Sequence, residues 1–326
     1  MKKIRVAVVY GGRSGEHEIS LRSAESVIAA MDPERYEVTR FVIDLGGHWS
    51  PEPILPQPGA HPEIDVVFPV LHGTFGEDGT VQGLFELADL PYVGAGVLAS
   101  ALSMDKDFMK RVCRDAGLPV VECKVLGREE LDPEEVARGL SFPLFVKPAN
   151  LGSSVGISKA HNMEELAAAL KVAAEFDRKV IVERGIEGRE FECSVLGNEN
   201  PAAAVPCEIL PSREFYDYED KYELNLAQTV LPADLPENEI AEIRRLAVAC
   251  YKAVGCEGLG RVDFLREKST GKFYINEINT MPGFTSISMY PKMWAYAGIP
   301  YSQLIDRLIE LALERHAIKK ATRFTR

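Results

Sequence analysis

The 326-residue sequence predicts an α/β protein of two or three domains. Its length exceeds that of one ordinary domain. Nearly continuous apolar runs such as Ile64–Leu71 alternate with helical patterns, which is typical of parallel strands covered on both faces. Hydrophobic residues make up 46% and charged residues 26%, the balance of a globular protein.

The net charge of −12 argues against bulk binding of nucleic acid or anionic membranes, so an anionic substrate would need a local basic pocket. No apolar run approaches the roughly 18 residues of a membrane helix. The apolar stretch in Met1–Tyr10 runs into Gly11 and Gly12 without a cleavage site, so it predicts a first strand and not a signal peptide. The six cysteines lack metal-site spacing, which favours free thiols in a reducing cytoplasm over zinc or disulfides.

The elements follow from periodicity and from turn residues. Residues 1–102 predict a small doubly wound domain, in which Ser50–Pro62, with five prolines, is a surface loop. Its predicted elements are a strand at 4–10, a helix at Ser20–Met31, and strands at Tyr36–Ile43 and Ile64–Leu71.

Two further domains are predicted at residues 103–187 and 188–326. The third is strand-rich, with an amphipathic helix at Glu239–Val254 and a last helix at Tyr301–His316. The predicted elements of the second are helix Lys106–Ala116, strand Pro143–Lys147, helix Met163–Phe176 and strand Lys179–Glu183.

A divalent-cation site is predicted on two neighbouring strands. Glu277 and Asn279 lie two residues apart in an alternating strand, so their side chains share a face. Arg261 and Asp263 share a face of the strand just upstream in the same way. A buried carboxylate needs a partner, and carboxylate and amide oxygens are ligands that Mg²⁺ prefers. The pattern indicates a Mg²⁺–nucleotide site with Arg261 facing developing negative charge.

The segment Pro143–Gly156 is a strand with Lys147 near its end, followed by a Gly/Ser-rich loop. The N–H groups of such a loop can bind phosphates, and Lys147 can meet them as a point charge. It lacks the Gly-Lys-Ser/Thr ending of a Walker A loop, and an ordinary turn is the alternative.

Substrate residues are predicted after the first and third strands. Gly11–Glu18 lies where substrates bind α/β sheets, and Glu16 could hold a substrate ammonium. The alternative for Glu16 or Glu18 is a charge at a helix N-terminus. His72, in a glycine-rich loop, is the favoured histidine, and His17 is the second candidate.

The polar, aromatic segment Ser212–Glu223 has no periodicity. This composition predicts a loop that orders over a ligand, and exposed decoration is the alternative.

Together these residues resemble the D-alanine–D-alanine ligase family of the ATP-grasp superfamily over nearly the whole chain. The segments that carry the resemblance are 11–20, 71–83, 103–106, 146–156, 216–222, 260–263 and 276–283. The resemblance implies an ATP-grasp fold of three domains with ATP between the central and C-terminal domains. It also implies that ATP phosphorylates one D-alanine, whose acyl phosphate the amine of a second D-alanine attacks, giving a dipeptide for cell-wall precursors.

The resemblance also implies roles at the two substrates. Glu16 would anchor the ammonium of the first D-alanine and join Ser153 and Tyr222 in a network that closes the lid loop 212–225. His72 would line the same pocket.

Further roles follow for the reaction centre and the nucleotide. Arg261 and the N–H of Gly283 would form the oxyanion hole, and Ser288 and Lys221 would hold the second D-alanine's carboxylate. The residues implied at ATP are Lys106, Lys147 and Lys221 for the phosphates, Ser153 and Ser154 in the loop, and Glu183 and Glu190 for adenine and ribose. Those implied for two Mg²⁺ or Mn²⁺ ions are Asp263, Glu277 and Asn279.

Lys221 and Tyr222 keep the dipeptide-ligase form, which favours D-alanine over D-lactate or D-serine as second substrate. A biotin-dependent carboxylase or glycinamide-type ligase is the enzyme alternative, and an inactive nucleotide-binding regulator is the alternative outside catalysis. We expect a cytoplasmic homodimer without nucleic-acid or membrane partners.

Overall fold

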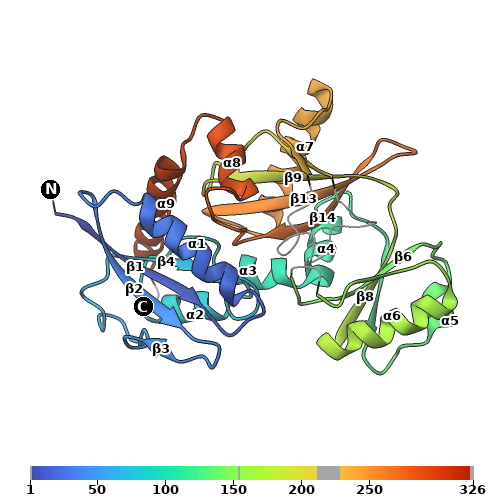
Figure 1. Cartoon of the computed structure of the whole chain (residues 1–326), viewed down its shortest axis with the longest axis horizontal. Helices are drawn as coiled ribbons and strands as arrows, with labels where there is room; N and C mark the ends of the chain where they lie inside the picture. The colour runs from blue at the N-terminus through green and yellow to red at the C-terminus, as the bar shows by residue number, and fades with distance from the viewer. Residues whose placement is uncertain (1, 153–154, 211–227, 324–326) are drawn as a thin grey trace.

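The computed structural model describes residues 2–152, 155–210 and 228–323, and these residues form an α/β fold with three sheets (Figure 1). The first sheet has the order β3-β2-β1-β4, in which β2, β1 and β4 are parallel and β3 is antiparallel. Its elements and the helices that follow are β1 (Ile4–Gly11), α1 (His17–Ala30), β2 (Tyr36–Ile43), β3 (Trp49–Ser50), β4 (Val66–Val70), α2 (Thr80–Leu87) and α3 (Val97–Met104).

The turn after β1 depends on a glycine. Gly11 has φ +88°, and a Cβ there would lie 2.2 Å from the carbonyl oxygen of Ile43. The N–H of Gly11 donates to Ser20 Oγ at 2.7 Å, which ties the first turns of α1 to the end of β1. Residues 12–16 are thereby held at the carboxyl edge of the sheet, where α/β proteins bind ligands.

The second sheet is antiparallel, with the order β5-β8-β6-β7. Helices α5 and α6 pack on it around a hydrophobic core of their own. Figure 1 shows this unit at the right, with α6 along its outer side. Its elements and the preceding helix are α4 (Lys106–Asp115), β5 (Cys123–Gly127), α5 (Pro133–Ala137), β6 (Leu144–Pro148), β7 (Ser158–Ala160), α6 (Met163–Phe176) and β8 (Lys179–Arg184).

The third sheet has the order β12-β11-β9-β13-β14, with β10 paired to β9. One hydrophobic core joins this sheet to α7 and to Met109 and Cys113 of α4. Its elements and the last helices are β9 (Gly188–Leu196), β10 (Ala202–Ala203), β11 (Cys207–Leu210), β12 (Gln228–Val230), α7 (Glu237–Ala253), β13 (Leu259–Glu267), β14 (Phe273–Asn279), α8 (Met289–Tyr296) and α9 (Tyr301–Lys320).

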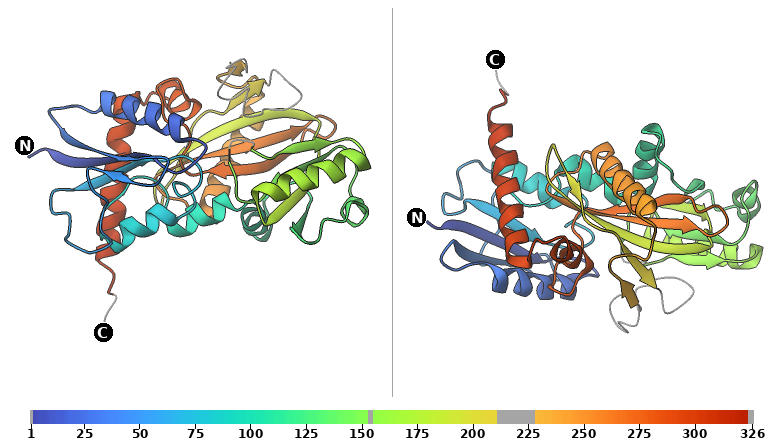
Figure 2. Two further views of the ribbon diagram at one scale, coloured as in Figure 1. Left: turned by 60° about the horizontal axis from the view of Figure 1, so that its bottom comes forward. Right: turned by 90° about the horizontal axis from the view of Figure 1, so that it is seen from above.

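The first sheet and the last two helices share a core. Val6 and Phe68 belong to the same apolar cluster as Tyr290 and Leu308, and the rings of Phe68 and Phe284 meet edge-on with centroids 6.1 Å apart. Figure 2 shows α9 crossing beside the first sheet in both views. The two ends of the chain therefore pack together, while the domain limits at residues 102 and 187 stay predictions.

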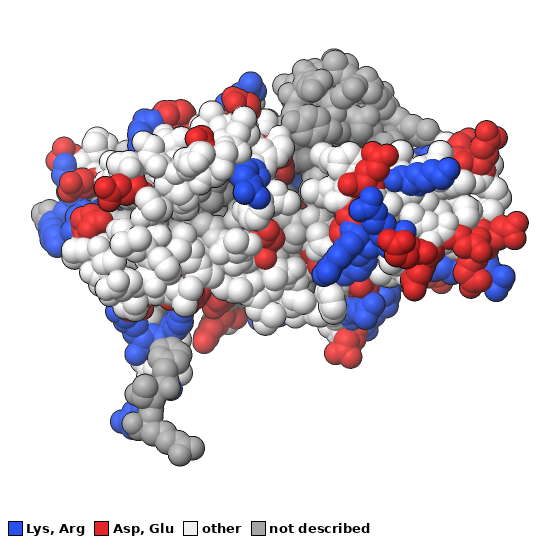
Figure 3. Space-filling view, turned by 90° about the horizontal axis from the view of Figure 1, so that it is seen from below, with Lys and Arg blue, Asp and Glu red and all other residues white. Residues whose placement is uncertain are grey.

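Three features of the structure concern the expectations from composition: the surface charge, the state of the cysteines and the character of the helices. On the face seen in Figure 3, acidic and basic side chains of the described residues intermingle over the part that carries β5–β8, without an extended basic area. All six cysteines are free, and five are buried. Within the described ranges, no helix combines the length and apolarity needed to cross a bilayer.

Candidate active site

The four polar residues predicted on two strands share one face of the third sheet. β13 and β14 pair antiparallel, with Arg261 opposite Asn279 and Asp263 opposite Glu277. The register shifts after Asp263, so Asn276 is an extra residue in β14. Such a bulge lets two successive side chains, here Asn276 and Glu277, both leave the core face. The predicted arrangement of the two strands is confirmed, and we call these four opposed residues the polar face.

Carboxylates surround the arginine of the polar face. Arg261 donates from Nε and Nη2 to the two Asp263 oxygens at 2.7 and 2.6 Å, and its Nε lies 3.4 Å from Glu192 Oε2. Burial opposes the charged form, but Asp263 and Glu192 outweigh burial and raise the pKa of the guanidinium. Arg261 is therefore a permanent cation held in a fixed orientation.

Two predicted lysines contact β14, one at the polar face and one at the neighbouring Asn276. Lys106 Nζ is 3.4 Å from Glu277 Oε2 and donates to the carbonyl of Leu151 at 2.6 Å. Lys147 Nζ donates to Asn276 Oδ1 at 3.2 Å. Both lysines are buried, so their charges are only weakly screened by solvent. Cations from α4 and β6 thus meet oxygen ligands from β14.

The carboxylate of Glu16 lies against two glycines. A Cβ on Gly73 would be 2.7 Å from Glu16 Oε2, and one on Gly152 would be 3.6 Å away. Glu16 precedes α1 without a side-chain capping bond, whereas Glu18 lies in the first turn of that helix. The helix-terminus alternative thus describes Glu18, and the Glu16 carboxylate faces the loops after β4 and β6.

His72 joins the N-terminal domain to the end of β14. Its Nδ1 is 3.0 Å from the carbonyl of Met281, and its Nε2 is 3.1 Å from Ser23 Oγ. Burial lowers the pKa of the imidazole, so the ring is neutral at pH 7. Since a carbonyl only accepts, Nδ1 carries the proton and Nε2 accepts from Ser23. The second candidate, His17, contacts the carbonyl of Gly12 through Nδ1 at 2.7 Å.

Glu77 is a partly buried acid that was not among the predicted site residues. The N–H of Gly73 donates to its Oε2 at 3.0 Å, so Glu77 and Glu16 flank the same glycine. Burial, and then the charge of Glu16, raise the pKa of the Glu77 carboxyl well above its usual value. Glu77 and Glu16 are therefore two interacting acids beside one glycine, close to the loops after β4 and β6.

The segment after β14 brings Gly283 and Ser288 together. A Cβ on Gly283 would lie 3.3 Å from Ser288 Oγ, which also accepts from the N–H of Thr285 at 3.1 Å. Ser288 immediately precedes α8 but makes no side-chain capping bond there. Its hydroxyl thus faces the turn that carries the Gly283 N–H.

The two glutamates predicted at adenine and ribose differ in their surroundings. Glu183, on β8, has one oxygen 2.8 Å from Lys147 Nζ and the other 2.9 Å from Lys110 Nζ. Burial alone would raise the pKa of the Glu183 carboxyl, but the two ammonium groups lower it to about 2. Glu190 lies on β9, opposite Leu265 of β13. Glu183 is therefore an ion-pair bridge in this structure.

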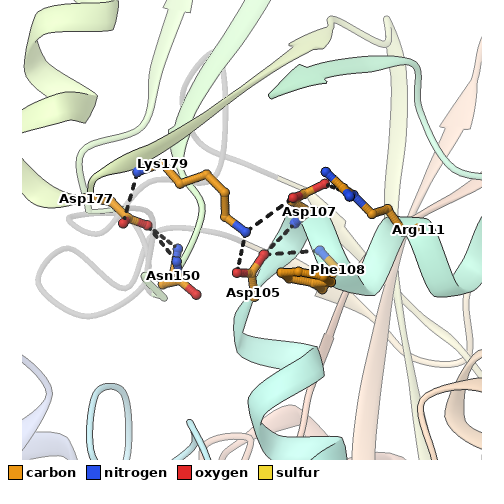
Figure 4. Close-up of polar contacts among 7 residues, drawn as sticks. All are labelled: Asp105, Asp107, Phe108, Arg111, Asn150, Asp177 and Lys179. Carbon is orange, nitrogen blue, oxygen red and sulfur yellow. Dashed lines mark hydrogen bonds and ion pairs between the residues drawn. The ribbon is translucent and has the colours of Figure 1, made fainter. Parts of the chain in front are cut away.

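An ionic cluster on the outer side of α4 fixes the helix that carries Lys106. Lys179 from β8 binds Asp105, the N-cap of α4, and lies 3.2 Å from Asp107 Oδ2 (Figure 4). Asp177 accepts from the Asn150 side chain at 2.9 Å. A surface pocket of about 570 Å³ lies here, and Asp105, Asp107, Arg111 and Lys179 in its wall are paired with one another, so we assign this cluster a structural role.

Several predicted residues lie outside the described ranges: Ser153, Ser154, Lys221, Tyr222 and the whole lid loop 212–225. Conversely, the structure adds site residues that the sequence analysis passed over. These are Glu77, Lys110, Glu192 and Asn276. For Lys110 the available signal was its position one turn after Lys106 on a predicted helix.

Known proteins match this chain over nearly its whole length. A family model described as D-ala D-ala ligase C-terminus matches residues 112–310, and one described as D-ala D-ala ligase N-terminus matches residues 5–61 and 55–95. The D-alanine–D-alanine ligase of Solibacter usitatus is 67% identical over 324 residues, covering 99% of this chain and 100% of that protein.

Solved structures of ligases share the fold of this chain. The D-alanine-D-alanine ligase from Coxiella burnetii has a TM-score of 0.87 and 38% identity, covering 98% of this chain and 97% of that one. VanG D-Ala:D-Ser ligase from Enterococcus faecalis has a TM-score of 0.88 and 37% identity, covering 95% and 100%. The fold and site are those of an ATP-grasp enzyme, an ATP-dependent ligase. The chain belongs to the D-alanine–D-alanine ligase family, which confirms the predicted family and excludes the carboxylase and glycinamide-type alternatives.

Proposed function

We propose that this ATP-dependent ligase joins two D-alanines to D-alanyl-D-alanine through a D-alanyl phosphate, for peptidoglycan precursor synthesis. The observation that supports this reaction most directly is the polar face of β13 and β14, with Lys106 against it and Lys147 at the neighbouring Asn276. Transfer of a phosphoryl group to a carboxylate brings two anions together, so cations must offset their repulsion.

The donor atoms of the polar face fit a divalent cation. Asp263, Glu277 and Asn279 supply only oxygen, the ligand type that Mg²⁺ and Mn²⁺ take. Within the described ranges, no three His, Cys, Asp or Glu residues form a metal group by themselves, and phosphate oxygens of the nucleotide would complete the shell. When bound, the ion would neutralise and orient the phosphates. We propose two such ions.

Protein groups would then act on the substrates. Glu16 would bind the ammonium of the first D-alanine, and His72 would line that pocket in its neutral form. Arg261 and the N–H of Gly283 would stabilise the oxyanion as the second amine attacks, while Ser288 and Lys221 would hold the second carboxylate. Ser153 and Ser154 would bind phosphate, Glu190 the nucleoside, and the lid loop would exclude water from the acyl phosphate.

Phosphate release from ATP is expected to require both D-alanine and a divalent cation, since repulsion between carboxylate and phosphate must be offset. The measurement is phosphate release with D-alanine, L-alanine, D-serine and D-lactate offered in turn, with and without EDTA. Ready turnover with L-alanine alone or in excess EDTA would contradict the proposed function.

The ratio of dipeptide to D-alanyl-D-lactate depends on Tyr222 if its hydroxyl joins Glu16 and Ser153. Tyr222→Phe removes only that hydroxyl, worth about 1 kcal/mol in a neutral hydrogen bond and more beside a charge. We expect a modest, about fivefold loss of dipeptide synthesis and a gain in D-alanyl-D-lactate. Both products are quantified side by side, and an unchanged product ratio would reduce Tyr222 to a packing role.

We also propose a homodimer in the cytoplasm. The five buried free thiols support a reducing compartment, in which they need no disulfide partner. Sedimentation of the purified chain tests the dimer, and a monomer at micromolar concentration would overturn it.

A further inference from the structure

Asp177 is a partly buried carboxylate with no role in the proposed function. It is the C-cap residue of α6, an end at which the helix dipole disfavours negative charge. Its Oδ1 accepts from the N–H of Lys179 at 3.2 Å. Its Oδ2 accepts from both the backbone N–H and the side-chain Nδ2 of Asn150, at 2.8 and 2.9 Å (Figure 4). The paired bonds to Asn150 therefore need a reason outside α6.

Asn150 lies where the backbone leaves β6 and enters the Gly/Ser-rich loop. The residue before it is fixed from two sides. The N–H of Ala149 donates to the carbonyl of Lys179 at 3.0 Å, and its carbonyl accepts from the N–H of Lys106 at 3.0 Å. The start of the loop is thus placed between β8 and the first turn of α4, the helix that carries Lys106.

The residues after Asn150 are held by a different kind of contact. The carbonyl of Leu151 accepts from Lys106 Nζ at 2.6 Å, and the carbonyl of Gly152 accepts from the N–H of Val155 at 3.2 Å within the loop. Lys106 is itself proposed to bind phosphate, so its bond to Leu151 shares the ammonium with the nucleotide. Asp177 is an anchor of this loop that has no proposed contact with the phosphates.

We propose that Asp177 is a positioning residue for nucleotide binding: through Asn150 it holds residues 150–152, the start of the Gly/Ser-rich loop, where the loop can meet the ATP phosphates. This inference rests on the proposed function, in which that loop and Lys147 face those phosphates. A segment that is held in place beforehand does not have to be ordered when the ligand binds, so binding is tighter. Asp177 itself touches neither substrate nor nucleotide.

Charge and positioning predict opposite effects at this residue. The carboxylate of Asp177 is negative, as the ATP phosphates are, so its charge alone opposes ATP binding. If charge were its whole influence, removing it would lower the Kd for ATP. If Asp177 positions the loop, removing it raises that Kd. The sign of the change therefore distinguishes the two effects.

The test measures equilibrium binding of ATP and, by competition, of adenosine to the full-length protein. Asp177→Ala removes both bonds to Asn150, so the Kd for ATP should rise about tenfold. Adenosine, which has no phosphate, should bind within about twofold of wild type. An unchanged or lower Kd for ATP would overturn the proposal, and equal weakening of ATP and adenosine would mean a merely structural role.

Two further variants serve as controls. Glu175→Ala removes a carboxylate at an exposed position of α6, two residues earlier, and should leave both affinities unchanged. Asp177→Ser keeps an oxygen for the N–H of Lys179 but gives up Asn150, because its side chain is one bond shorter. It should weaken ATP binding as Asp177→Ala does, also if the alanine variant folds poorly. Wild-type ATP affinity in Asp177→Ser would mean that Asp177 serves only the turn after α6.

A double variant tests whether Asp177 acts through Asn150. Asn150→Ala removes the side-chain donor and keeps the backbone N–H, so the Kd for ATP should rise about threefold. Added to Asp177→Ala, the same change should cost less than about twofold, because both substitutions break one contact. Fully additive effects would mean that the two residues act separately, and the proposal would be wrong. A wild type without D-alanine-dependent turnover would instead reject the proposed function, whatever the variants bind.

Discussion

Glu277→Gln is expected to lower turnover about a thousandfold while the protein folds as before. The substitution removes one negative charge from the polar face and keeps the volume of the side chain. Two consequences follow together: the proposed metal loses its strongest ligand, and Lys106, 3.4 Å away, loses its ionic partner. The side chain is 27% exposed, so the core is not disturbed.

The measurement is D-alanine-dependent phosphate release at saturating ATP over a range of Mg²⁺ concentrations, with thermal unfolding to confirm the fold. Glu175→Gln, the same change at an exposed position of α6, is the matched control and should keep full activity. Wild-type-like turnover of the Glu277 variant would remove this residue from the metal site.

Arg261→Ala is expected to lower kcat by about 100-fold or more, the size of effect seen when one oxyanion donor is lost. Its side chain is only 16% exposed and is held in place by Asp263 and Glu192, so it can meet developing charge without reorganising. Because the substitution removes a cation 3.4 Å from the buried Glu192 carboxylate, some stability should also be lost.

The two effects are separated by measuring kcat and KM well below the melting temperature. Arg261→Lys keeps the charge but not the paired donors, and should fall between Ala and wild type. If only the KM for ATP rises in Arg261→Ala, the arginine binds the ground state and has no special role in the transition state.

Much of the fold could be predicted because periodic segments encode it locally. Strand Tyr36–Ile43 and helix Met163–Phe176 begin and end where their patterns predict. Helix α1 begins at His17 and not at Ser20, because the N–H of Ser20 already donates to the carbonyl of Glu16 at 3.0 Å, the first hydrogen bond of the helix. Strands as short as β3 and β10 were missed, since their pairing depends on neighbours supplied by the tertiary fold.

The site residues could be predicted where they depend on the alternation of side chains between the two faces of a strand. That rule places Glu277 with Asn279 and Arg261 with Asp263, and the family resemblance supplied the remaining roles. The alternation did not predict Asn276 as a site residue, because a β-bulge interrupts the alternation at that position. Nor could it pair Lys110 with Glu183, which lie 73 positions apart and meet only when α4 packs beside β8.

The shared core of the first sheet and the last helices bears on how the chain is made. During synthesis β4 ends at Val70, but α9, which helps to cover it, ends at Lys320. At about 5–20 residues per second the ribosome needs roughly 10 to 50 s to make the intervening 250 or so residues. For that interval Val6 and Phe68 lack part of their final cover. We therefore expect the nascent N-terminal part of the chain to expose apolar surface until translation ends.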